Sequence, residues 1–113
     1  DLRGLNPRFQ PGNVDTNLAL VDKLRAIAEG VSATPAQLAI AWVTAQGNDI
    51  VPLVGARRRD RLTEALGALN VKLQPSHLGE LAKAFPPGIA AGERYPESHL
   101  AHMDSERRLA ARG

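Results

Sequence analysis

A chain of 113 residues is long enough for one small domain, but too short for a large barrel or for two domains with separate cores. Its 43% hydrophobic and 23% charged residues are typical of a globular protein, and 4% aromatic residues with a net charge of +2 argue against a nucleic-acid-binding surface. The absence of cysteine excludes disulfides and thiolate metal sites, and it is compatible with the reducing cytoplasm, where we expect the protein.

The N-terminal residues 1–14 are rich in proline and glycine and show little periodicity, so we interpret them as a loop. Apolar residues then recur at helical spacing, and they predict a helix that is capped by Asp15 or Thr16 and ends at Gly30. The first residue is Asp1 rather than Met, and we expect that sequence upstream of it is missing from this chain.

The next segment, Thr34-Pro35-Ala36-Gln37, has the pattern of a helix start: a capping threonine, proline at the first helical position and glutamine three residues after the cap. We expect this helix to run to Gly47. The unbroken apolar run at residues 50–54 (IVPLV) follows, and it predicts a strand that is buried on both faces in a parallel sheet.

Two more helices are predicted after the strand, one with an apolar stripe from Leu62 to Leu69 and one that starts near Gln74. Residues 88–113 are expected to form an irregular tail with one short helical turn. The result is about four helices and a single strand. Because a buried strand needs neighbouring strands for its backbone groups, we expect the chain to be part of a larger structure.

The turn from Gly55 to Arg61 carries four arginines between the predicted strand and the following helix. Cations are disfavoured at a helix N-terminus by roughly 0.3–1 kcal/mol each. A bound phosphate would remove this conflict, because the free N–H groups and the guanidinium groups both donate hydrogen bonds to it. A solvated cluster of surface arginines is the alternative interpretation.

Residues 39–69, AIAWVTAQGNDIVPLVGARRRDRLTEALGAL, resemble the end of the barrel in the aldo-keto reductase family, from its seventh helix to its eighth. The agreement is most specific over residues 38–69. It continues in VKLQPSHLGEL (71–81) and AGERYP (91–96), and LRGLNPRF (2–9) is similar to the active-site loop of the bacterial branch. The resemblance extends from residue 1 to about residue 107.

The resemblance implies an α/β fold, the (β/α)8 TIM barrel, of which this chain would be the C-terminal part. Residues 1–14 would be the active-site loop, residues 15–87 the last helices and the eighth strand, and residues 88–113 the C-terminal tail. The family reduces aldehydes and ketones to alcohols with NADPH and without a metal, so the resemblance implies NADP as the cofactor and a small carbonyl compound as the substrate.

The cofactor-binding positions implied by the resemblance are Gly55, Ala56, Arg57, Arg61, Glu64 and Ala65. Gly55 ends the strand, Arg57 and Arg61 would contact the 2′-phosphate, and Glu64 would accept a hydrogen bond from the adenine amino group. Ala65 stands where the family usually has Asn, so one adenine hydrogen bond is lost here.

No catalytic residue is implied within this chain, because the family's tetrad of Asp, Tyr, Lys and His lies upstream. Tyr95 belongs to the tail motif instead, and the isolated chain is expected to be inactive. His99 and His102 are three residues apart but lack a third metal ligand at a credible spacing. Arg3 and Arg8 would either line the active-site mouth or be surface charges.

Two other classes of function compete with a reductase fragment. A helical module that uses the arginines on nucleic acid is disfavoured, because a strand separates the helices that a helix-turn-helix would need. A truncated, inactive relative that acts as a structural or interaction module would have the same sequence features. Self-association is expected for it, because apolar surface made for the missing barrel would be exposed. No interaction with a membrane is expected, since no apolar run approaches the roughly 20 residues that a membrane span needs.

Overall fold

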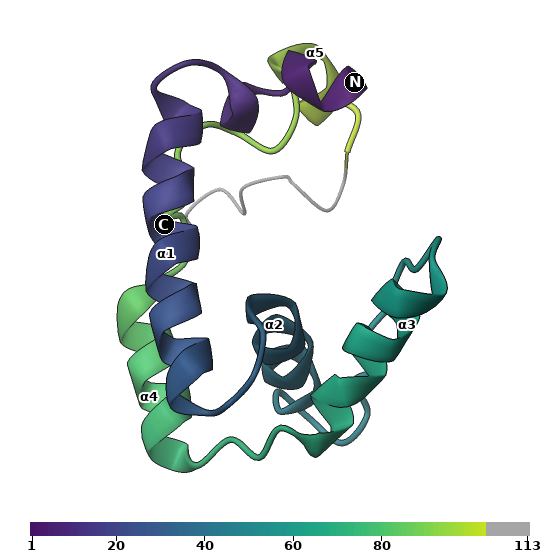
Figure 1. Ribbon diagram of the computed structural model, residues 1–113. Coiled ribbons are helices and arrows are strands. Elements are labelled where there is room, and N and C mark those ends of the chain that lie inside the picture. The colour runs from purple at the N-terminus through teal and green to yellow at the C-terminus, as the bar shows by residue number, and fades with distance from the viewer. Residues whose placement is uncertain (104–113) are drawn as a thin grey trace. The chain divides into compact units, whose positions relative to one another are not determined.

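The computed structural model describes residues 1–103, and the regular structure within them is helical. The elements in chain order are η1 (Leu2–Leu5), η2 (Pro7–Phe9), α1 (Asn13–Gly30), α2 (Pro35–Thr44), α3 (Arg59–Leu66), η3 (Gly67–Asn70), α4 (Pro75–Ala84) and α5 (Glu97–Leu100), where η denotes a 3-10 helix (Figure 1). They belong to two compact units. One comprises residues 1–19 and the chain from Gly88 onward, the other residues 20–87, and each is described here by itself.

The helices form where the local sequence signals predict them. Thr34 caps α2 through its hydroxyl, which accepts from the Gln37 N–H at 3.2 Å, while the Gln37 side chain accepts from the Thr34 N–H at 3.0 Å. Gln74 caps α4 in the same reciprocal way, and His77 Nδ1 accepts from its N–H at 3.0 Å. The four longer helices and the short turn of α5 confirm the predicted helices of the described part.

The start of α1 differs from the prediction. The helix begins at Asn13, so Asp15 and Thr16 lie in its first turn and neither is its cap. The loop winds directly into the helix, because the Gln10 and Gly12 carbonyls accept from the N–H groups of Val14 and Thr16 at 3.0 and 3.3 Å. Residues 1–14 are likewise more regular than a simple loop, since they contain η1 and η2.

The predicted strand at residues 50–54 is not confirmed: the described residues 1–103 contain no strand. A strand exists only through hydrogen bonds to a neighbouring strand, and these residues have no such neighbour in the described part. The expected burial is absent too, because the Val51 and Leu53 side chains are 80% and 97% exposed.

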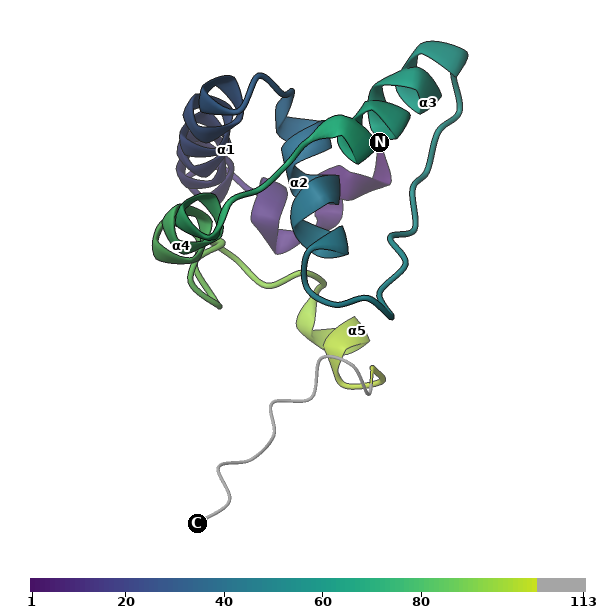
Figure 2. The same cartoon turned by 90° about the horizontal axis from the view of Figure 1, so that it is seen from below.

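The core of the unit formed by residues 20–87 is small. It consists of Ile27 and Ala28 from α1, Leu38 from α2 and Leu81 from α4, with Phe85 packed at its edge. Both ribbon views show α1 and α4 side by side (Figures 1 and 2). Contacts of α2 with α3 and η3 complete this unit. Many large apolar side chains remain exposed, including Val51, Leu53, Leu62, Leu66 and Leu69.

In the other unit, Asn17 joins the N-terminal turns to the segment after Gly88. Its Nδ2 donates to the carbonyls of Arg8 and Ala91 at 3.1 and 2.9 Å, and its Oδ1 accepts from the Ala91 N–H at 2.8 Å. Gly92 follows with φ +79°, and a side chain there would lie 2.8 Å from the Pro7 carbonyl oxygen. Glycine is therefore required at this close approach.

Candidate functional site

A pocket of about 260 Å³ lies at the junction of α2, α3 and the residues between them. Its lining residues are Ala36, Ile40, Val54, Gly55, Arg57, Arg58, Arg61, Glu64 and Ala65. Of the six predicted cofactor positions, all but Ala56 line it. The structure thus brings five predicted residues together with Ala36 and Ile40 of α2, which the sequence did not single out.

The turn before α3 forms the part of the pocket wall that lies next to the N-terminus of α3. Arg58 is the N-cap residue of α3, and its side chain makes no capping hydrogen bond. It is instead paired with Asp60, where Nε and Nη2 donate to the carboxylate at 3.0 and 2.8 Å. The α3 N-terminus therefore has no side-chain cap, and such an end presents backbone N–H groups and a partial positive charge to solvent.

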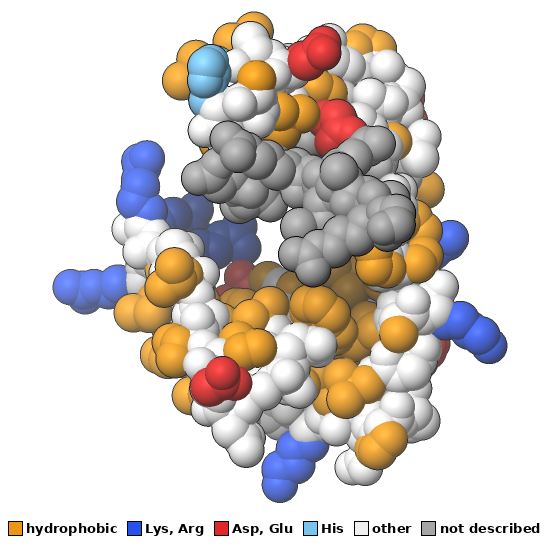
Figure 3. Space-filling model, turned by 180° about the vertical axis from the view of Figure 1, so that it is seen from behind, with side chains coloured by type: hydrophobic (Ala, Val, Ile, Leu, Met, Phe, Trp, Pro, Cys, Tyr) orange, Lys and Arg blue, Asp and Glu red, His pale blue; other side chains and the backbone are white. Residues whose placement is uncertain are grey.

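The four arginines of this turn are not equivalent. Arg58 is paired with Asp60 and Arg61 with Glu64, whereas Arg57 and Arg59 make no ion pair with any other residue among 1–103. Arg57 lines the pocket and Arg59 does not. In the space-filling view, blue basic side chains gather at one edge of the molecule, beside exposed orange hydrophobic side chains (Figure 3). Arg57 is thus the unpaired positive charge of the pocket wall within the described part.

Glu64 is held as a carboxylate by its neighbours. Its side chain is 25% exposed, and Arg61 Nη1 donates to Oε2 at 3.0 Å. A hydrogen bond with the Thr34 side chain and then the hydrogen bond from Arg61 lower the pKa of Glu64 below its ordinary value of 4.5. Glu64 is therefore ionised at neutral pH, and the oxygens of an ionised carboxylate are acceptors only.

The N-terminal turn of α2 fixes α3 in place. Gln37, the capping-box residue, donates from Nε2 to the Glu64 carbonyl at 2.9 Å. Thr34 and Gln37 were recognised in the sequence as a helix cap, and the cap is confirmed. Their second role toward Glu64 was missed, because no local pattern reports a contact across 27 residues.

The other candidate residues are engaged elsewhere. Arg8 is half-buried, and its Nε donates to the Gly92 carbonyl at 3.4 Å. Arg3 pairs with Asp1. The Tyr95 ring is half-buried and lies 5.3 Å from the Arg94 guanidinium carbon. In residues 1–103 no group of three His, Cys, Asp or Glu side chains is arranged to hold a metal ion. Residues 104–113 of the predicted tail lie outside the described residues.

No helix in the described part of the chain is long and apolar enough to span a membrane. The sequence model of the Aldo/keto reductase family matches residues 3–85, well over half of the chain. The chain belongs to the aldo/keto reductase family. The resemblance seen in residues 38–69 is thereby confirmed.

A curated relative is similar to a large part of this aldo-keto reductase chain. It is described as "Probable aldo-keto reductase 1" from Glycine max, and it is 44% identical over 90 residues, which are 80% of this chain and 26% of the relative. The chain therefore spans about a quarter of the length of the curated relative it matches.

Proposed function

We propose that this chain supplies the site for the 2′-phosphate and adenine of NADP in an oxidoreductase that reduces aldehydes and ketones to alcohols with NADPH. The observation that carries the proposal is the pocket in which Arg57, Arg61 and Glu64 lie together beside the uncapped start of α3. Family membership supports the oxidoreductase chemistry. This chain would form the C-terminal part of the reductase's (β/α)8 barrel, as the family resemblance implies.

The donors and acceptors of the pocket fit the adenosine-phosphate end of such a cofactor. Arg57 has no ion pair within residues 1–103, so a phosphate would gain its full set of guanidinium donors. Glu64 is ionised and would accept from the adenine amino group. The volume of about 260 Å³ is below the common range for sites that enclose a whole ligand, roughly 300–1,000 Å³, so this pocket would hold only one end of the dinucleotide.

Arg61 has a second role in this proposal. It contacts Glu64 through Nη1 alone, so its other N–H groups remain for the phosphate while the ion pair persists. Ala56 adds no side chain to the pocket lining, and Ala65 offers adenine only an apolar contact. Two charged hydrogen-bonding contacts, each worth roughly 1.5–3 kcal/mol, would favour NADP over NAD.

The test is a calorimetric titration of 2′,5′-ADP and of 5′-AMP into the protein. We expect 2′,5′-ADP to bind more tightly, and we expect the Arg57→Gln/Arg61→Gln double variant to lose this preference. The matched control is Arg25→Gln, which removes an exposed arginine that is paired with Asp22 on α1. Equal affinities of the unaltered protein for the two nucleotides would rule out the phosphate site.

The alternative is an inactive relative that acts as a structural or interaction module. The exposed apolar side chains of residues 50–69 favour it, because they form a surface that another chain could cover. Self-association belongs to this alternative. A cytoplasmic location is part of both proposals and rests on the absence of cysteine.

A further inference from the structure

Glu64 is held through both its backbone and its side chain by the N-terminal turn of α2. Its backbone carbonyl accepts from Gln37 Nε2 at 2.9 Å, and its carboxylate hydrogen-bonds with the Thr34 side chain. Thr34 and Gln37 are half-buried and do not line the candidate pocket, whereas Glu64 does. One acceptor of the pocket wall is therefore positioned by two side chains that are not part of that wall.

The direction of the hydrogen bond between Thr34 and Glu64 follows from the chemistry of the two groups. A hydroxyl has a single proton to donate and an ionised carboxylate only accepts, so Thr34 is the donor. The Thr34 Oγ1 also accepts from the Gln37 N–H at 3.2 Å. The backbone amide, the hydroxyl and the carboxylate thus form a chain of hydrogen bonds, in which each bond strengthens the next. The cap of α2 keeps the hydroxyl aligned toward Glu64.

The Glu64 carboxylate retains acceptor positions for a ligand. Arg61 Nη1 donates to Oε2 at 3.0 Å, and the Glu64 side chain is 25% exposed. A carboxylate has about four lone-pair sites, and Thr34 and Arg61 occupy two of them. The 6-amino group of adenine is a donor, whereas guanine and hypoxanthine carry a carbonyl oxygen, an acceptor, at the same position. Two acceptors that face each other repel, so a fixed carboxylate distinguishes these bases.

We propose that Thr34 is a positioning residue of the candidate site, which holds the Glu64 carboxylate so that the pocket selects a 6-aminopurine nucleotide over a 6-oxopurine one. This role rests on the proposed function, in which the adenine end of NADP occupies the pocket. It adds that the choice of base depends on a residue that does not touch the nucleotide. Without the Thr34 hydroxyl, Arg61 becomes the stronger hold on the carboxylate and draws it away from the base.

Calorimetric titration of 2′,5′-ADP and of its deaminated analogue, which carries hypoxanthine, compares the two bases while both phosphates stay the same. We expect the protein to bind the adenine nucleotide about tenfold more tightly, because hypoxanthine leaves an acceptor unpaired on each side. Thr34→Val is expected to lower this ratio about threefold or more, and Thr34→Ser, which keeps the hydroxyl, to retain it. The preference for 2′,5′-ADP over 5′-AMP should be unchanged in both variants.

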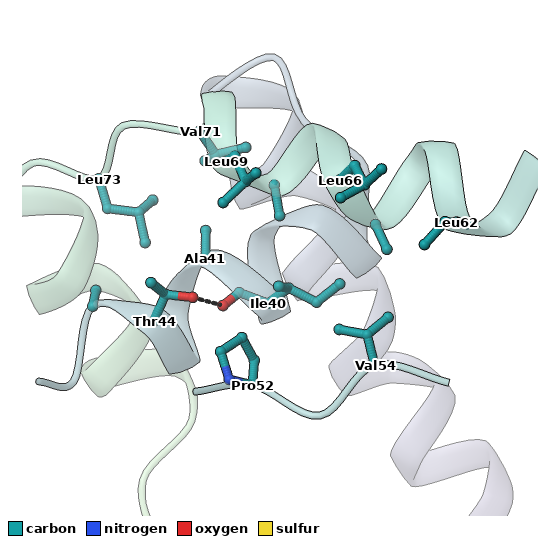
Figure 4. A pocket seen from close by; sticks show the side chains of 13 residues that line it. Ile40, Ala41, Thr44, Pro52, Val54, Leu62, Leu66, Leu69, Val71 and Leu73 are labelled. Atoms are coloured by element: carbon teal, nitrogen blue, oxygen red, sulfur yellow. Dashed lines mark hydrogen bonds between the residues drawn. The ribbon is translucent and has the colours of Figure 1, made fainter. Parts of the chain in front are cut away.

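Thr34→Asp separates the hydrogen bond to Glu64 from the cap of α2. Aspartate caps a helix as well as threonine does, but an ionised carboxylate has no proton to donate and repels Glu64. This variant should keep its helix content by circular dichroism and still lose the base ratio. The matched control is Thr44→Val on α2. The Thr44 hydroxyl donates to the Ile40 carbonyl at 3.1 Å, beside a neighbouring apolar pocket of about 380 Å³ (Figure 4). Its loss should leave the base ratio unchanged.

A base ratio that survives in both Thr34→Val and Thr34→Asp overturns the role of Thr34, and so does equal binding of the two bases by the unaltered protein. If 2′,5′-ADP is then still preferred over 5′-AMP, the phosphate site stands and only the role of Thr34 fails. Conversely, a base preference that depends on Thr34, together with equal affinities for 2′,5′-ADP and 5′-AMP, supports the role of Thr34 and rules out the phosphate site. Binding of none of these nucleotides overturns both.

Discussion

Gln37 Nε2 donates to the backbone carbonyl of Glu64 at 2.9 Å and so ties the start of α2 to the middle of α3. The same side chain completes the capping box of α2 through its other terminal atom. One residue therefore stabilises a helix end and also sets the wall of the candidate site. A methyl group added at Gly67 would lie 2.3 Å from Gln37 Nε2, so the glycine leaves the space that this amide occupies.

Replacing Gln37 with Ala is expected to lower the free energy of unfolding by about 1–2 kcal/mol, because one cap contact and one cross-helix hydrogen bond are lost. Urea unfolding followed by circular dichroism measures the change. Gln46→Ala is the matched control, since Gln46 only donates to the Trp42 carbonyl near the end of α2 and is exposed. An equal loss in both variants would show that the contact to Glu64 contributes nothing.

The pKa of Glu64 is expected to rise toward its ordinary value of 4.5 when Thr34 is replaced by Val, because the Thr34 hydrogen bond is the largest cause of its lowering. The folded pKa lies below the unfolded one, so this group stabilises the fold above pH 4.5, and the contribution is lost as the pH falls through the folded pKa. An NMR titration of the Glu64 carboxyl carbon measures the shift. Thr34→Ser retains the hydroxyl and should leave the pKa nearly unchanged. An unaltered pKa in Thr34→Val contradicts the assignment.

Ala65→Asn is expected to tighten the binding of 2′,5′-ADP and of 5′-AMP by the same factor, roughly three- to tenfold. The amide would add one hydrogen bond to adenine, worth about 0.5–1.5 kcal/mol, and it would not touch the phosphate. The titrations described for the proposed function measure both affinities. Ala39→Asn, on α2 outside the candidate pocket, is the control. If only 2′,5′-ADP gained affinity, position 65 would not face the adenine.

Asn17→Ala is expected to expose the Ala91 N–H and to destabilise its unit by about 1–3 kcal/mol, since three partly buried hydrogen bonds depend on this amide. Hydrogen exchange at Ala91 should accelerate accordingly. Asn17→Asp keeps the oxygen that accepts from Ala91 and should retain part of the protection. Unchanged exchange in Asn17→Ala would mean that the tail is held by other contacts.

The isolated 113-residue chain is expected not to turn over substrate, because its family resemblance places the catalytic tetrad outside it. NADPH oxidation in the presence of a simple aldehyde, followed by absorbance, measures this directly. A control with bound 2′,5′-ADP shows that the preparation is folded. Turnover by the purified chain would contradict the prediction and would require a catalytic residue within these 113 positions.

The helices and their ends were predictable from the sequence because their causes are local. The capping threonine and proline at Thr34-Pro35, the spacing of apolar residues and the closing glycine of α1 all act within a few residues. The start of α1 was missed by three or four residues, since the preceding turn continues into the helix. The family, too, was evident in residues 38–69, and the sequence alone placed the arginine-rich turn at a helix start.

Only the tertiary structure decided what surrounds that turn. It set the cap residue Thr34 and Ala36 and Gln37 of α2 against α3, paired Arg61 with Glu64 and left Arg57 without an ion pair within residues 1–103. Among the residues that the structure describes, it also left residues 50–54 without a strand partner and with Leu53 in solvent. The apolar run by itself predicted a buried strand, but a strand is a property of two segments: its hydrogen bonds and its burial come from a neighbour, and no pattern within one segment can supply them.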